Sequence, residues 1–117
     1  DELLIPILMR AGHLYFEDYP WSEKTISTFS GLQMQRYQPG QHFDWHADGD
    51  SGDRRLAAIL YLNDDFEGGE TEFRHQEVVY TPRAGSILLF PPYWTHVHRG
   101  APIRSGAKFI MTSFFLR

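Results

Sequence analysis

The chain of 117 residues is long enough for one folded domain, and its content of 42% hydrophobic and 15% aromatic residues excludes intrinsic disorder. The absence of cysteine excludes a disulfide scaffold, thiolate–zinc sites, iron–sulfur clusters and a cysteine nucleophile. The net charge of −4 argues against a protein that binds the nucleic-acid backbone.

The start of the chain predicts a short helical or irregular segment. Residues 1–12 fit the end of a helix with a boundary at Gly12, although Pro6 interrupts the pattern. The apolar run 3–9 is too short for a membrane span and lacks the form of a signal peptide, so we expect a cytoplasmic protein without a membrane partner. Because the first residue is not methionine, we expect a single domain, 1–117, that is trimmed at its N-terminus.

From residue 32 onward, short runs rich in apolar and β-branched residues alternate with turn residues about every 8–12 positions. Proline and glycine pairs, such as residues 39–40, 68–69 and 91–92, separate the runs. This punctuation predicts a mainly β fold of the jelly-roll or barrel type. The predicted strands are residues 32–37, 42–46, 56–62, 70–74, 77–81, 86–90, 95–98 and 108–116.

The charges are divided unevenly along the chain. Residues 1–77 hold all 15 acidic residues and six of the 11 basic ones, a net charge of −9. Residues 78–117 hold five basic residues and no acidic one, a net charge of +5. Chance and solvated faces can produce such a division. A functional interpretation is that the acidic part supplies ligands for a cation and the basic part receives a small anion.

The first side chains that indicate chemistry are His46 and Asp48. Residues two apart in a strand point to the same face, so we expect the imidazole and the carboxylate to converge. A His-x-Asp triplet is common by itself. A calcium loop that starts at Asp48 is excluded, because its fifth and twelfth positions are Gly52 and Ile59, where oxygen ligands are needed.

A third metal ligand is expected from the late histidines, His96 and His98. Both belong to the strand predicted at 95–98 and share one face, so strand parity does not choose between them. Two histidines and one carboxylate, with open positions on the metal, form the usual site of non-haem Fe(II) oxygenases. Zinc hydrolysis tolerates the same ligand types, so ligand chemistry alone leaves the metal open.

Five runs of sequence follow one another in a characteristic order: YQPGQHFDWHAD (37–48), LYLN (60–63), GGETEF (68–73), PRAGSILLF (82–90) and HRGAPIRSGAK (98–108). Together, these runs resemble the prolyl 4-hydroxylase-like 2-oxoglutarate/Fe(II)-dependent dioxygenase family. The resemblance covers about residues 32–116 and depends on the order and spacing of the runs rather than on any single motif. It implies a double-stranded β-helix, the jelly-roll fold that cupins also have.

The resemblance implies an iron site made of His46, Asp48 and His98. In the family, the distal histidine precedes a basic residue by ten positions, with a proline and a glycine between them. His98 and Lys108 keep this register, whereas His96 does not. His96 is therefore interpreted as a histidine that packs beside the site.

Three further residues are implied to bind the cosubstrate. At the position of Lys108 the family has a basic residue that holds the C5 carboxylate of 2-oxoglutarate, because a desolvated dicarboxylate needs a cation at its far end. Tyr61 matches a tyrosine whose hydroxyl also reaches that carboxylate, and Tyr37 matches another tyrosine of the pocket. Thr71 and Phe73 are interpreted as residues that shape the fold.

Two positions depart from the family pattern, and both weaken any transfer of substrate specificity. Phe114 stands where the family often has tryptophan, and Phe43 stands where it usually has tyrosine. The loop 47–55, rich in aspartate and glycine, is a candidate mobile lid. The candidate residues of the substrate rim are Trp45, Arg54, Arg55, Tyr93 and Trp94.

The implied reaction hydroxylates a C–H bond with Fe(II) and O2 and converts 2-oxoglutarate to succinate and CO2. Ascorbate commonly maintains the iron in related enzymes. The expected substrate is a prolyl residue of a peptide or protein, and the alternative is a small metabolite. Two other classes stay open. A cupin-like metal isomerase or hydrolase would not need Lys108 and Tyr61 around a dicarboxylate, and a non-catalytic jelly-roll binding module would leave the histidines apart.

Overall fold

Antiparallel strands are the main regular elements of the computed structural model, which describes residues 3–49 and 52–117. Among these residues, no helix is both long and apolar enough to span a membrane. The elements in chain order are α1 (Leu4–Asp18), α2 (Pro20–Glu23), β1 (Thr28–Phe29), β2 (Gln33–Tyr37), β3 (Phe43–His46), β4 (Arg54–Tyr61), β5 (Glu67–Gly68), β6 (Thr71–Phe73), β7 (Val78–Tyr80), β8 (Ile87–Phe90), the 3-10 helix η1 (Trp94–His96), β9 (His98–Gly100), β10 (Ile103–Ser105) and β11 (Lys108–Leu116).

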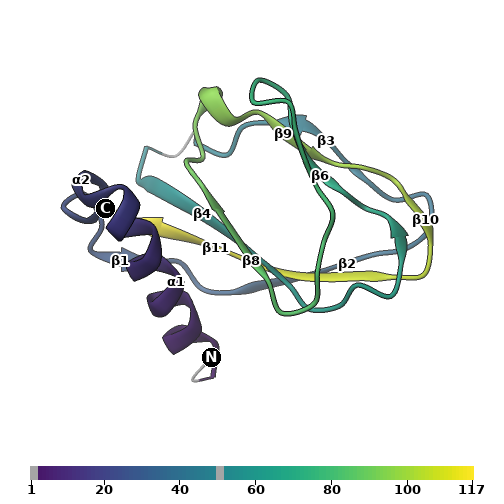
Figure 1. Cartoon of the computed structure of the whole chain (residues 1–117), viewed down its shortest axis with the longest axis horizontal. Helices are drawn as coiled ribbons and strands as arrows, with labels where there is room; N and C mark the ends of the chain where they lie inside the picture. Colours follow the sequence, from purple (N-terminus) through teal and green to yellow (C-terminus); the bar gives the residue numbers. More distant parts are fainter. Residues whose placement is uncertain (1–2, 50–51) are drawn as a thin grey trace.

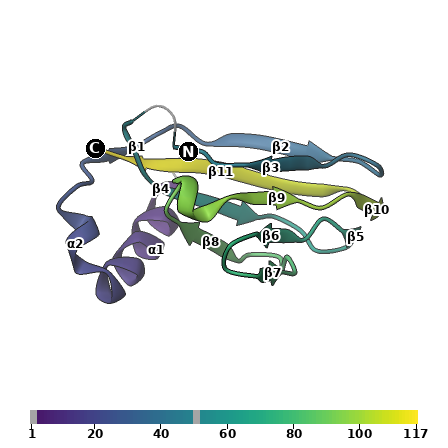
Figure 2. The same ribbon diagram turned by 90° about the horizontal axis from the view of Figure 1, so that it is seen from above.

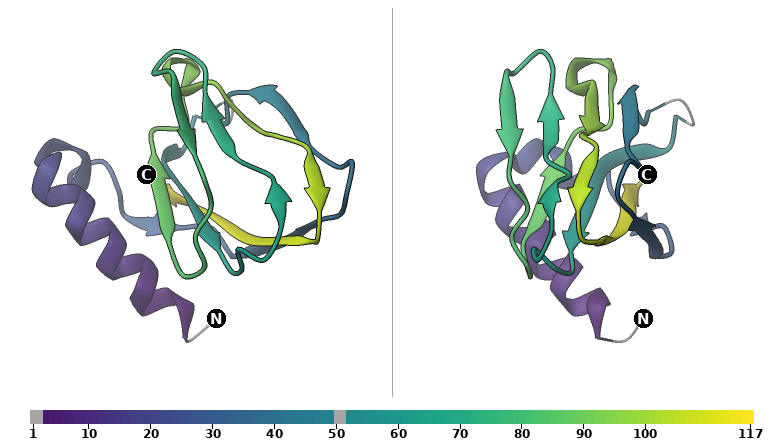
Figure 3. Two further views of the ribbon diagram at one scale, coloured as in Figure 1. Left: turned by 45° about the vertical axis from the view of Figure 1, so that its right-hand side comes forward. Right: turned by 90° about the vertical axis from the view of Figure 1, so that its right-hand side faces the viewer.

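The strands form the two facing layers of a double-stranded β-helix, so the expected fold class is confirmed (Figures 1 and 2). The larger sheet has the order β1-β11-β4-β8, and β2 also pairs with β11. The smaller sheet has the order β3-β9-β6-β7. Strands β5 and β10 pair with each other at the end of the barrel away from the helices. The helices lie outside the barrel, where α1 runs beside β8 (Figure 3).

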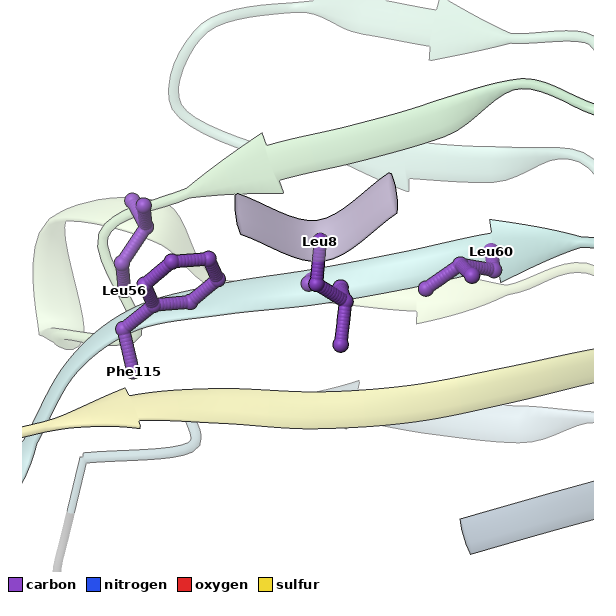
Figure 4. Close-up of a cluster of buried hydrophobic side chains, with 5 residues drawn as sticks. Leu8, Leu56, Leu60 and Phe115 are labelled. Carbon is purple, nitrogen blue, oxygen red and sulfur yellow. The ribbon is translucent and has the colours of Figure 1, made fainter. Parts of the chain in front are cut away.

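Strand β4 is buried on both faces, which explains its nearly continuous apolar sequence. Leu56 and Leu60 point toward α1 and belong to the hydrophobic cluster on the helix side of the sheet (Figure 4). Ala57 points the other way and packs with Phe90 in a second cluster inside the barrel. The larger sheet therefore has a dry outer face against α1 and an inner face that borders the space between the sheets.

Helix α1 is longer than the sequence predicted. It continues through Gly12 to Asp18, so the expected boundary at Gly12 is wrong. A glycine stands there because a Cβ at this position would lie 2.7 Å from the ring of Phe115, which means that only glycine lets the helix approach the sheet so closely. Pro6 is tolerated because it lies in the first turn, where the backbone N–H has no partner within the helix.

The strand predicted at 95–98 is also wrong. The 3-10 helix η1 occupies the first half of that segment, and β9 begins only at His98. The two prolines that follow β8 have no N–H to continue a strand ladder, and the chain turns instead, with the N–H of His96 donating to the carbonyl of Tyr93 at 2.9 Å. The β-branched residues Thr95 and Val97 favour a strand that the backbone does not adopt here.

The other predicted strands are confirmed to within two residues at each end, and the range 108–116 coincides with β11. Three very short strands, β1, β5 and β10, were not predicted. Each has two or three residues, too few for a periodic pattern, and β5 overlaps the glycine pair 68–69 that was interpreted as a turn. Their strand character comes from pairing with a distant segment.

We expect the substitution Leu8→Ala to lower the free energy of unfolding by about 2–5 kcal/mol, because it leaves a cavity between α1 and the sheet. Leu8 has no exposed surface and packs in the cluster with Leu56 and Phe115. The matched control is Leu14→Ala on the same helix, where the leucine is 47% exposed and we expect a loss below about 1 kcal/mol. Urea unfolding followed by circular dichroism measures both variants, and equal losses would contradict the packing of α1.

Candidate functional site

The three predicted metal ligands come together where β3 and β9 meet. His46 ends β3, Asp48 follows two residues later, and His98 begins β9 directly opposite His46 in the strand register. One carboxylate oxygen of Asp48 lies 3.1 Å from Nε2 of His46, and the other lies 3.3 Å from Nε2 of His98. Figure 1 shows the two strands side by side. One ligand atom from each residue falls within a group whose members are all within 4.8 Å of one another.

Backbone carbonyl groups orient both imidazoles. Nδ1 of His46 lies 2.7 Å from the carbonyl oxygen of Asp44, and Nδ1 of His98 lies 2.9 Å from the carbonyl oxygen of His96. Because a carbonyl oxygen only accepts hydrogen bonds, each Nδ1 carries a hydrogen. A neutral ring then has its lone pair on Nε2, and both Nε2 atoms face Asp48. This arrangement is the one that a metal ion bound between the three residues requires.

The pKa values in the cluster reflect strong mutual attraction. Burial by itself raises the pKa of Asp48, but hydrogen bonds with His46 and His98 and the charges of both rings outweigh it and hold this pKa well below its usual range. Burial by itself lowers the pKa of His46, but its hydrogen bonds with Asp48 and with the Asp44 carbonyl outweigh burial and raise this pKa. The cluster therefore attracts positive charge. A divalent cation would displace the protons that the two imidazoles share with Asp48.

A cavity of about 340 Å³ opens beside the cluster, inside the barrel and between the two sheets. Its volume lies within the range of small-molecule sites in proteins. The wall is polar at the cluster and mixed along β4 and β11, where Ala57, Ile59, Ile110 and Phe114 supply apolar surface. The lining residues that matter for the chemistry, besides the cluster itself, are Tyr37, Phe43, Thr71, Phe90, Lys108 and Phe114.

Lys108 is buried in this cavity, with 4% of its surface exposed. It begins β11 in the larger sheet, yet its Nζ donates a hydrogen bond of 2.8 Å to the carbonyl of Gly69. The same Nζ lies 3.8 Å from the place that a Cβ on Gly100 would occupy, so the side chain crosses the barrel to a point two residues along β9 from His98. Burial, which the charge of Glu70 offsets only in part, lowers the pKa of Lys108 to about 8.

Two tyrosine rings flank the Lys108 ammonium group, at 5.5 Å from the ring centre of Tyr37 and 5.8 Å from that of Tyr61. The hydroxyl of Tyr37 donates to the side chain of Gln35 at 2.9 Å. Tyr61 has 1% of its surface exposed and stands behind the cavity wall rather than in it, and burial raises its pKa. Its hydroxyl lies 2.5 Å from Oγ1 of Thr71, which does line the cavity.

Sequence reasoning did not assign Thr71 or the Gly69 carbonyl to the site, although both lie close to Lys108. A signal for Thr71 was present, because it stands two residues before the inward-facing Phe73 and therefore shares its face of the strand. A carbonyl group carries no such signal, since every residue has one. The side chain of His96 lies outside the cluster and contacts the hydroxyl of Thr95 at 2.9 Å.

Only some of the residues predicted for the substrate rim line the cavity. Arg54 lines it, whereas Trp45 packs with the guanidinium groups of Arg74 and Arg99, at 5.7 and 5.1 Å from its ring centre. Trp94 is 79% exposed on η1. Within the predicted 47–55 lid, residues 50 and 51 lie outside the described residues.

A family model and the relatives found by sequence comparison all point to the same group of oxygenases. The family model of the 2OG-Fe(II) oxygenase superfamily matches residues 32–116. A putative prolyl 4-hydroxylase of Acanthamoeba polyphaga mimivirus is 31% identical over 105 residues, which cover 72% of this chain and 43% of that protein. The multifunctional procollagen lysine hydroxylase and glycosyltransferase of Homo sapiens is 37% identical over 101 residues, which cover 85% of this chain and 13% of that protein. The chain spans less than half the length of either relative.

Solved structures show the same fold. The viral collagen prolyl hydroxylase of Paramecium Bursaria Chlorella virus-1, in its 2-oxoglutarate complex, matches with a TM-score of 0.79 at 26% identity over 97% of this chain and 72% of that one. A prolyl-4-hydroxylase of Pseudomonas putida matches with a TM-score of 0.64 at 23% identity over 80% of this chain and 54% of that one. The segment matched by the family model includes the His46, Asp48 and His98 cluster and Lys108. This chain belongs to the 2OG-Fe(II) oxygenase superfamily.

Proposed function

We propose that the chain is the catalytic domain of a 2-oxoglutarate- and Fe(II)-dependent dioxygenase that hydroxylates a prolyl residue of a peptide or protein. The observation that carries the proposal is the presence of two unlike binding functions in one cavity. At one place, His46, Asp48 and His98 form a cluster suited to a cation. Farther along the barrel, the buried ammonium group of Lys108 is suited to an anion.

The donor atoms of the cluster fit Fe(II). Two imidazole nitrogens, one from each of two paired strands, and one carboxylate just beyond β3 border the cavity, and this donor set is typical of non-haem Fe(II) oxygenases. His46, Asp48 and His98 would hold the ion. When bound, the iron supplies the oxygen chemistry, in which 2-oxoglutarate and O2 yield succinate, CO2 and a hydroxylated substrate. Ascorbate is the expected reductant for the metal.

The far end of the cavity fits the C5 carboxylate of 2-oxoglutarate. Gly100 marks the position of the Lys108 ammonium group, and it stands two residues, or about 7 Å, from His98 along β9. This spacing suits an extended five-carbon diacid whose other end reaches the metal. We assign Lys108 as the counter-ion of the carboxylate and Thr71, backed by Tyr61, as a hydroxyl donor to it. The ring of Tyr37 packs against the other side of the Lys108 ammonium group.

Aromatic rings pack against both imidazoles. The ring of Phe43 lies 4.2 Å from that of His46, and the ring of Phe90 lies 4.7 Å from that of His98, centre to centre. Phe90 is buried and limits the access of water on the His98 side of the cluster, whereas Phe43 is 47% exposed and leaves the His46 side more open. The imidazoles are therefore fixed by packing as well as by their Nδ1 hydrogen bonds.

The assignment of a prolyl substrate draws support from relatives named as prolyl hydroxylases. Relatives named as procollagen lysine hydroxylases, at up to 37% identity, make a lysyl residue the second candidate. We place the enzyme in the cytoplasm, acting on peptides or proteins rather than on nucleic acid or membranes. The rival class of metal isomerases and hydrolases has no use for a buried cation beside the metal, which is why Lys108 favours the dioxygenase.

We expect the purified protein with Fe(II), O2 and 2-oxoglutarate to form succinate, and His46→Ala to reduce the rate by more than about 100-fold, above the loss typical of a residue that only supports a ligand. The matched control is His75→Ala in the exposed turn before β7, which we expect to keep the full rate. Succinate formation by His46→Ala at the rate of the unsubstituted protein would contradict the iron site. Peptides that present proline or lysine, followed by mass spectrometry for the gain of one oxygen atom, identify the residue that is hydroxylated.

We expect Lys108→Met to weaken 2-oxoglutarate binding by roughly 100-fold or more, because the C5 carboxylate loses its buried counter-ion. The same substitution is expected to stabilise the ligand-free protein by about 1–3 kcal/mol, because it removes a buried charge that has no ion pair among the residues that the structure describes. Isothermal titration and urea unfolding measure the two effects. Arg104→Met, at an exposed residue of β10, is the control and should change neither.

The stabilisation by Lys108→Met should depend on pH. The pKa of Lys108 is about 8 in the folded protein against an ordinary value of 10.5. The charged form of the lysine therefore lowers the free energy of unfolding. Below pH 8 the lysine is charged in both states and the full cost applies, and above pH 10.5 it is neutral in both states and the cost is absent. The difference in unfolding free energy between the two proteins should therefore shrink as pH rises from 8 to 10.5. A constant difference would contradict a buried charge.

A further inference from the structure

Asp48 differs from its two partner ligands in how it is held. His46 and His98 belong to paired strands, and hydrogen bonds and packing fix both rings. Asp48 lies beyond the end of β3, so no strand ladder holds its backbone. The Asp48 carboxylate can contact both imidazoles only if the Asp48 backbone is held in position. Two features of the structure around this loop hold it.

The first feature is Arg54, at the start of β4. Its guanidinium group donates a hydrogen bond of 2.7 Å to the backbone carbonyl of Asp48. The same group stacks on the ring of Phe114, 4.1 Å from the ring centre, and Phe114 pairs with Ala57 across β11 and β4. Because this bond goes to the carbonyl and not to the carboxylate, the side chain of Asp48 stays directed at the histidines. Arg54 thus ties the ligand loop of the smaller sheet to the larger sheet.

The second feature is the residue that follows the ligand, Gly49. A Cβ at this position would lie 2.5 Å from the carbonyl oxygen of Pro92 and 3.0 Å from the ring of Tyr93. The nearest obstacle is backbone, and Pro92 is fully buried, so neither side can move away easily. Any side chain at position 49 would push the loop, and the adjacent Asp48, out of its present place.

We propose that Arg54 and Gly49 are positioning residues that hold the backbone of Asp48 so that its carboxylate completes the metal site. The proposal rests on the proposed function, in that His46, Asp48 and His98 are the metal ligands. Arg54 pulls the Asp48 carbonyl toward β4 and β11, while Gly49 lets the loop settle against the segment that precedes η1. Positioning of a ligand by such contacts is worth roughly 10- to 100-fold in metal affinity.

The test is the affinity of the protein for Mn(II), read from the electron paramagnetic resonance signal of the free ion, without 2-oxoglutarate. We expect Arg54→Gln to raise the dissociation constant roughly 10- to 100-fold. The matched control is Arg55→Gln, because Arg55 also donates to a carbonyl of this loop, that of Gly52 at 2.6 Å, but does not touch the ligand. We expect Arg55→Gln to stay within about threefold of the unsubstituted protein.

Gly49→Ala provides an independent measurement, since it alters packing and no charge. We expect a weakening of Mn(II) binding similar to that of Arg54→Gln. Its control is Gly31→Ala, because a Cβ at Gly31 meets no atom within 4 Å. Thermal unfolding without metal separates positioning from general stability: a merely structural role lowers the melting temperature and leaves the dissociation constant of the folded protein unchanged. If Arg54→Gln does not fold, Gly49→Ala decides.

The outcomes separate this proposal from the proposed function. Mn(II) binding by the unsubstituted protein that is lost in His46→Ala supports the ligand set. With that result in hand, Arg54→Gln or Gly49→Ala binding Mn(II) within threefold of the unsubstituted protein would overturn the positioning role alone. Absence of Mn(II) binding by the unsubstituted protein would overturn both.

Discussion

The antiparallel register between β3 and β9 is the constraint on which the whole site depends. It sets His46 directly opposite His98, which brings the two ring centres to 4.3 Å and both Nε2 atoms to the same carboxylate. A slip of one residue would turn one imidazole to the other face of the sheet and separate the cluster. The register is held from the far side as well, because Phe73 on β6 lies opposite His98 and the two rings pack at 5.6 Å.

Burial of Lys108 lowers the stability of the fold, and a role in ligand binding would explain why a lysine stands there. A basic side chain with 4% exposure and a lowered pKa is costly in a ligand-free barrel, and an apolar residue would pack there without that cost. Its hydrogen bond to the Gly69 carbonyl satisfies a single donor, and the charge has no ion pair in the described part of the chain, where Glu70 offsets the cost of burial only in part. An anionic ligand would resolve this conflict, so the buried lysine indicates a ligand class that the size of the cavity alone does not.

Much of the architecture was predictable because it follows from local pattern. The alternation in 108–116 marks β11 from end to end, and the family resemblance, through the ten-residue spacing between His98 and Lys108, predicted that both line one site. Where the local pattern gave a wrong prediction, a specific structural feature explains the error. Gly12 looked like a helix boundary but is needed for close packing on Phe115. Residues 95–98 looked like a strand but follow two prolines that turn the chain into η1.

The sequence by itself determined the fold class, the kinds of side chain available to the proposed metal site and the presence of a basic residue ten positions after His98, because side-chain chemistry and spacing are properties of the chain. The tertiary structure alone decided which groups meet. It placed Thr71 in the cavity wall with Tyr61 behind it, and it brought Arg54 to the carbonyl of Asp48. Such contacts join segments that are separate in the chain, and their distances arise only when strand pairing and the close approach of the two sheets fix the backbone.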